Sequence, residues 1–149
     1  MITVSLKKQE SLFKKYQALV FENIKTKLFE FLLRIGVSLT FLGHGILALG
    51  INEKWISLIT AFGFGNEAAR NLLPIIGSMD IFMALVLLFY PIRAIVIWAI
   101  IWPFAASVSY LVAGQTVWEF VERTSNWILP LALLLVMGVP KKKKVFEVR

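Results

Sequence analysis

Four apolar stretches, each long enough to cross a lipid bilayer as a helix, alternate with polar segments along the chain. The first runs from Phe31 to Gly50 and carries no charge after Arg34. Its length of about 20 residues corresponds to about 30 Å of helix, which matches the hydrocarbon thickness of a bilayer. The pattern therefore predicts an all-α, four-transmembrane-helix antiparallel bundle. The other three spans are expected at about residues 72–90, 92–113 and 116–138.

The fourth stretch is the least uniform of the four. Its first half, TVWEFVERTSNW, is far more polar than its second half, ILPLALLLVMG. A polar segment is a poor lipid-facing helix. The alternative to four spans is therefore three spans with a re-entrant fourth segment.

The residues before the first span have a different pattern. Between residues 1 and 27, apolar positions recur at helical spacing opposite a basic face, at Leu12, Phe13, Tyr16, Val20 and Ile24. This pattern predicts an N-terminal amphipathic interfacial helix on the inner membrane surface, although a docking helix for a partner protein has the same pattern. The predicted organisation is an amphipathic helix over 1–27, a membrane bundle over 28–138 and a basic cytoplasmic tail over 139–149.

The loop between the first two spans, residues 51–71, contains its own amphipathic segment, WISLITAFG. We expect a short interfacial helix here, with Trp55 at headgroup level and Gly63 and Gly65 at its end.

Composition and charge agree with a membrane protein. The chain is 58% hydrophobic and 17% charged, with a net charge of +7. Most basic residues flank the spans, which favours anionic lipids over nucleic acid as the partner. If the N-terminus is inside, Lys54, Arg70 and Arg123 are the only basic residues on the outer side of the membrane. Basic residues favour the cytoplasmic side, so we expect a bacterial-type cytoplasmic (inner) membrane with both termini cytoplasmic.

Polar side chains gather at one level of the predicted bundle. Helical rise places His44 about 9 Å and Asp80 about 12 Å below the outer ends of their spans. Tyr110 in the third span falls in the same layer, as do four polar residues of the fourth span, which are Glu119, Glu122, Arg123 and Asn126. The inner halves of the last three spans carry almost no ionisable residues. We therefore expect one outward-facing polar site.

The spacing in the fourth span sharpens this expectation. Glu119, Glu122 and Asn126 share one helix face, with Arg123 beside them. Charged groups within a bilayer are costly unless they are paired, so we expect Asp80, Glu122 and Arg123 to face the interior and to pair. In the simpler alternative, Arg123 only ties the helix end to Glu119 or Glu122, and His44 is a hydrogen-bonded packing residue.

Tryptophans divide into two groups by depth. Trp55, Trp118 and Trp127 suit the outer interface, whereas Trp98 and Trp102 lie deeper and are candidates for a ligand-facing wall. The chain has no cysteine, which excludes thiol chemistry and Cys-ligated metals. No metal site is expected. A hard divalent ion would have to use one histidine and three acids, namely His44, Asp80, Glu119 and Glu122.

Several short motifs are similar to those of a known family. The segments are Arg34-Ile35-Gly36, Phe41-Leu42-Gly43-His44-Gly45, Gly77 with Asp80 and Met83, and Tyr90-Pro91 with Arg93. Over roughly residues 28–138 the chain resembles the DoxX-like family of small four-helix membrane proteins, named for a subunit of a thiosulfate:quinone oxidoreductase. Asp80 stands where that family commonly has Glu. The resemblance implies a quinone-adjacent or electron-transfer-associated role.

Three functions are consistent with these observations. The first is binding of a quinone, a lipid or another amphipathic ligand in the polar pocket, as a subunit of a redox-linked membrane complex; enzymatic activity is left open. The predicted ligand-binding residues are His44, Asp80, Trp102, Tyr110, Glu119, Glu122, Arg123 and Asn126. The second is a non-catalytic accessory or scaffold subunit. The third, a small transporter or proton path, is disfavoured by the apolar inner half.

Overall fold

The computed structural model describes residues 2–138, with side chains from residue 12 onwards, so the predicted basic tail at 139–149 lies outside the described residues. The described part is built from helices: α1 (Ile2–Leu49), α2 (Glu53–Thr60), α3 (Asn66–Phe89), α4 (Arg93–Val112), α5 (Val117–Glu122) and α6 (Thr124–Met137). The all-α prediction is confirmed.

Four helical segments are long and apolar enough to cross a membrane. They are Leu12–Leu49, Asn66–Phe89, Arg93–Val112 and Val117–Met137. The last of these comprises α5 and α6, which meet at Arg123, so the break lies within the polar first half of the fourth span. The chain is thus a multi-pass membrane protein, as predicted.

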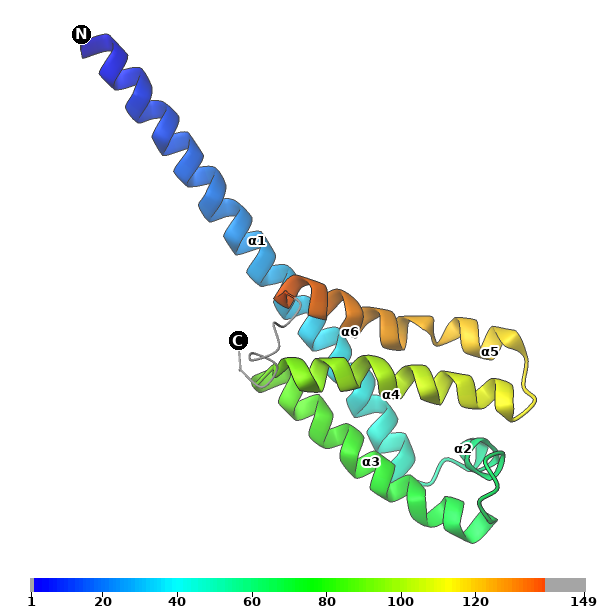
Figure 1. Ribbon diagram of the computed structural model, residues 1–149. Helices are drawn as coiled ribbons and strands as arrows, with labels where there is room; N and C mark the ends of the chain where they lie inside the picture. The colour runs from blue at the N-terminus through cyan, green and yellow to red at the C-terminus, as the bar shows by residue number, and fades with distance from the viewer. Residues whose placement is uncertain (1, 139–149) are drawn as a thin grey trace. The chain divides into compact units, whose positions relative to one another are not determined.

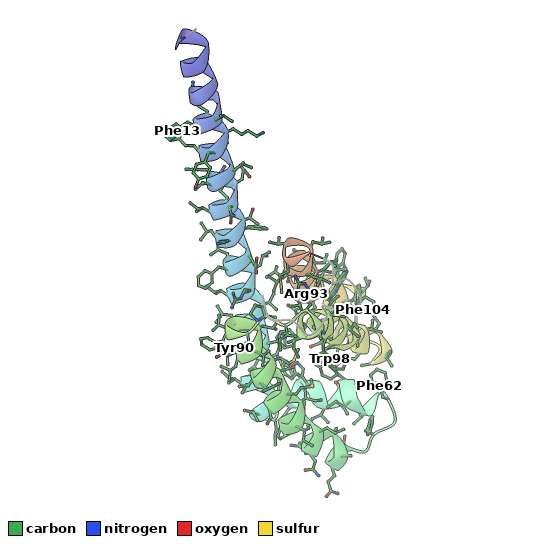
Figure 2. All side chains as sticks on the ribbon, turned by 60° about the vertical axis from the view of Figure 1, so that its left-hand side comes forward. Phe13, Phe62, Tyr90, Arg93, Trp98 and Phe104 are labelled. Atoms are coloured by element: carbon green, nitrogen blue, oxygen red, sulfur yellow. The ribbon has the colours of Figure 1, made fainter. Side chains whose placement is uncertain are left out.

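The chain divides into two compact units, residues 1–32 and 33–149, and α1 contributes to both. In the first unit, both apolar and basic side chains are exposed from residue 12 onwards, including Phe13 and Tyr16. Figure 2 shows Phe13 projecting from this part of α1. The surface on which this segment lies stays a prediction.

In the second unit, α4 lies between α3 and α6 (Figure 1), and it contacts both. The core of this unit joins α1, α3, α4 and α6 through fully buried side chains, among them Val37, Leu87, Val96 and Leu133. Helices that surround such a core bury their apolar stripes against one another and leave their other faces for lipid.

Two glycines allow α1 and α3 to touch at their backbones. A Cβ atom on Gly77 would lie 2.7 Å from the Gly45 carbonyl oxygen and 2.8 Å from the Leu49 nitrogen. A Cβ atom on Gly45 would lie 2.8 Å from the Gly77 carbonyl oxygen. Small residues at a crossing are how membrane helices approach closely, because lipid offers no hydrophobic drive for helices to associate.

Two arginines donate hydrogen bonds to the backbone carbonyls at the C-terminal ends of α3 and α6. Arg34 of α1 donates from Nε to the Leu87 carbonyl at 3.3 Å and from Nη2 to the Leu88 carbonyl, at the last turn of α3. Arg93 at the start of α4 donates to the carbonyls of Met137 and Gly138 at 3.1 and 3.2 Å, at the end of α6. Figure 2 shows Arg93 beside that helix end. The last carbonyls of a helix lack internal partners, and cations also favour its negative end.

The predicted short helix after the first span is confirmed as α2. Asn52 caps its N-terminus by accepting a hydrogen bond from the Lys54 backbone N–H, and Gly63 turns the chain with φ 87°. Ile56 of α2 packs on α3, where Glu53 and Arg70 also form a bidentate ion pair at 2.6 and 2.7 Å. Figure 1 shows α2 at the end of the unit where α3 begins.

Candidate functional site

A cavity of ≈ 480 Å³ lies in the second unit, beneath α2. Its walls come from the C-terminal part of α1, from α2 and the turn that follows it, from α3 and α4, and from the α5–α6 junction. This volume is within the range of about 300–1,000 Å³ that small-molecule sites occupy. Every helical segment that could cross the membrane therefore contributes to the wall of one cavity.

Most of the cavity wall is apolar or aromatic. The side chains of α2 and the following turn that border it include Trp55, Leu58, Phe62 and Phe64, and α3 adds Leu73 and Ile76. Figure 2 shows Phe62 next to α2. A few polar groups interrupt this wall. An apolar cavity with a small number of polar groups is the usual form of a site for an amphipathic molecule.

The structure brings together six of the eight residues proposed from the sequence. His44, Asp80, Trp102, Tyr110, Arg123 and Asn126 all line the cavity, whereas Glu119 and Glu122 do not. The expectation that Glu122 faces the interior is wrong, because its side chain is 76% exposed.

The break between α5 and α6 explains why Glu119 and Glu122 do not line the cavity. Arg123 has φ −90° and ψ 3°, outside the regular helix, and separates the two segments. Asn126 therefore does not follow Glu119 and Glu122 on one continuous helical face. The carboxylates of α5 stay outside the cavity while Asn126 of α6 borders it.

The glycine contact between α1 and α3 sets the level of two polar residues. Gly45 lies against Gly77 and Ile81, and Asp80 stands between those two positions in α3. His44 directly precedes Gly45. His44 and Asp80 therefore lie at the same level of the bundle, as the sequence predicted.

His44 has a defined orientation. Its Nδ1 lies 2.8 Å from the Thr40 carbonyl oxygen, and its ring stacks on Trp55 at 5.7 Å between centroids and 17° between planes. A carbonyl only accepts hydrogen bonds, so Nδ1 carries the proton. In the neutral imidazole, Nε2 is then left as an acceptor.

Asp80 is the buried acid of the cavity, with 5% of its surface exposed. Trp102 is a hydrogen-bond partner of its carboxyl group, whereas Oδ1 has no partner among the described residues. Among the residues that the structure describes, Asp80 and Arg123 do not form the expected ion pair, because Arg123 pairs with Glu119 and Glu122.

Arg123 is instead held by its own helix turn and by Tyr110. Its Nη1 donates to the carbonyl and carboxylate oxygens of Glu119 at 2.6 and 2.9 Å, and Glu122 Oε2 lies 3.4 Å away. Its guanidinium lies 3.8 Å from the Tyr110 ring centroid. Residues four apart on a helix are neighbours, so Glu119 reaches Arg123 at little entropic cost.

Sequence reasoning assigned Trp55 to the membrane interface and did not place it in the site. Its contact with His44 depends on α2 folding back over the end of the bundle, which the aromatic and glycine content of the loop indicated only weakly. Trp102 does line the cavity, as predicted, and it stacks on Trp98 at 6.0 Å.

Within the part of the chain that the structure describes, no three His, Cys, Asp or Glu side chains are grouped as metal ligands. The four residues considered for a hard divalent ion are therefore not together. Comparison of the chain with protein-family models, curated proteins and solved structures finds no match to any of them.

Proposed function

We propose that the cavity of this membrane protein binds a quinone or another amphipathic ligand, with the ligand's head group at the level of His44 and Asp80. This proposal rests on the ≈ 480 Å³ cavity, whose apolar and aromatic wall is interrupted by convergent polar groups. A quinone ring needs apolar surface for its faces and hydrogen-bonding groups for its oxygens. The cavity supplies both kinds of surface.

The finer assignment follows from the resemblance to DoxX-like proteins. We propose a place in a redox-linked complex of a bacterial-type inner membrane, with both termini cytoplasmic. Arg34 and Arg93, which belong to the resembling motifs, both cap helix ends at the end of the unit away from α2. Two arginines at that end agree with a cytoplasmic location for it.

The arrangement of the polar groups speaks against the two other functions. In a scaffold held together by its polar residues, Asp80 and Arg123 would pair across helices, but Arg123 pairs within its own turn. A proton path would have to continue beyond Asp80, where the core is formed by apolar side chains such as Met83, Leu87 and Leu133.

His44→Ala is expected to weaken binding of decylubiquinone at least tenfold, a change of about 1.4 kcal/mol, while the protein stays folded. The variant removes an aromatic ring that borders the cavity and stacks on Trp55, and with it the surface that would contact the quinone ring. Affinity is measured by tryptophan fluorescence on the full chain in lipid nanodiscs.

Trp118→Ala serves as the matched control, because this side chain is 72% exposed and does not border the cavity. It should bind the quinone like the wild type. Unchanged affinity in His44→Ala would reject the assigned role of the histidine. A native extract that contains a large complex and only ordinary phospholipid would instead favour the scaffold.

A further inference from the structure

One residue of the cavity wall has a buried side-chain atom without a hydrogen-bond partner. Among the described residues, three buried side-chain atoms lack a hydrogen-bond partner: Ser38 Oγ, Asp80 Oδ1 and Trp127 Nε1. Of these three residues, Asp80 alone borders the cavity. Buried polar atoms in folded proteins are nearly always paired, so an unpaired one beside a cavity indicates where a ligand bonds.

While Asp80 is ionised, its missing partner is a hydrogen-bond donor. An ionised carboxylate accepts hydrogen bonds and has about four lone-pair sites. Trp102 is its side-chain partner, and Oδ1 has none. The guanidinium of Arg123 is held by Glu119 and Tyr110. The described protein side chains therefore leave Oδ1 of Asp80 without a donor.

His44 adds a second acceptor at the same level. Because Nδ1 donates to the Thr40 carbonyl, Nε2 is the nitrogen that accepts a hydrogen bond when the ring is uncharged. Both residues border the cavity, and the contact of Gly45 with Gly77 and Ile81 holds them at one level. The polar end of the cavity is thus complementary to a head group that donates hydrogen bonds.

We propose that the head group recognised by Asp80 and His44 bears hydroxyl donors, as in a phenol or hydroquinone, and that the oxidised quinone, which has only acceptors, binds more weakly. This inference rests on the proposed function and specifies the form of the ligand. An alkylammonium head group also donates, but it would bring a second cation into a cavity already bordered by Arg123.

Two probes that differ by one donor test this proposal without redox chemistry. 4-Nonylphenol carries the hydroxyl, and 4-nonylanisole replaces its hydrogen with a methyl group. We expect the wild-type chain in nanodiscs to bind the phenol at least about tenfold more tightly, because a site built for a hydroxyl is left with an unpaired polar group by the ether. Affinities are measured by tryptophan fluorescence.

Asp80→Leu is expected to reduce this preference to about threefold or less, and to bind the ether at least as well as the wild type does. Glu122→Leu removes an exposed acid outside the cavity and should keep the wild-type preference. The melting temperature of each variant shows whether it is folded.

The outcomes separate the two proposals. Equal binding of phenol and ether by the wild type, or a preference retained in Asp80→Leu, would overturn the hydroxyl assignment and leave the cavity as a ligand site. Tighter binding of nonylamine than of nonylphenol would overturn it in favour of a cationic ligand. If decylubiquinone, the phenol and the ether all fail to bind the wild type, the proposed function fails as well.

Discussion

Gly77→Ala is expected to lower the free energy of unfolding by about 1–3 kcal/mol, the usual cost of overpacking a well-packed contact. The new methyl group would meet the Gly45 carbonyl oxygen at 2.7 Å and the Leu49 nitrogen at 2.8 Å. Both are backbone atoms, which do not move aside as the end of a side chain does. The α1 and α3 helices must therefore separate, which also shifts His44 relative to Asp80.

Two glycines of α1, Gly43 and Gly36, provide controls with different amounts of space for a new methyl group. A Cβ atom on Gly43 would meet nothing within 4 Å, so Gly43→Ala should be neutral or slightly stabilising. A Cβ atom on Gly36 would lie 2.9 Å from Leu129 Cδ2, the end of a flexible side chain. Gly36→Ala should therefore lower the free energy of unfolding by an intermediate amount. Unfolding in mixed micelles gives the three free energies, and equal values for Gly43→Ala and Gly77→Ala would contradict the close contact.

Arg34→Leu is expected to destabilise the bundle by about 1.5–3 kcal/mol, the magnitude of hydrogen bonds made by a charged group. The substitution removes the donors to the Leu87 and Leu88 carbonyls and leaves the end of α3 without these partners. In lipid, a freed carbonyl has less water to bond than in a soluble protein. The same micelle unfolding assay measures the loss.

Arg34→Lys should recover part of this loss, because an ammonium keeps the charge at the helix end but not the paired donors. Arg70→Leu is the comparison at the other end of the unit, where the ion pair with Glu53 is largely exposed. Its cost should stay below about 1 kcal/mol. If Arg34→Leu costs no more than Arg70→Leu, the capping role assigned to Arg34 is wrong.

These two predictions bear on the cavity as well as on stability. The Gly45–Gly77 contact sets the level of the two acceptors, and the arginine caps hold the helix ends at the opposite end of the unit. A variant that loosens the glycine contact is therefore expected to weaken ligand binding together with stability. A variant at Arg34 should change stability more than affinity, because Arg34 does not border the cavity.

Sequence patterns alone determined the helices and much of the site's composition. Apolar runs of bilayer length specify spans, because a helix is one of the few structures that satisfies its own backbone in lipid. Helical rise then relates position in the chain to depth, which brought His44, Tyr110, Arg123 and Asn126 to one region. The short helix α2 was also predictable, because glycines and an amphipathic pattern mark its extent.

Only the tertiary structure decided which of these polar groups face one another. The partner of Arg123 depends on the break in the fourth span, which joins the arginine to Glu119 and leaves Asp80 to Trp102. The capping by Arg34 and the stacking of His44 on Trp55 join residues on different helices. Periodicity describes one helix at a time, whereas the rotation and crossing of helices come from side-chain packing between them.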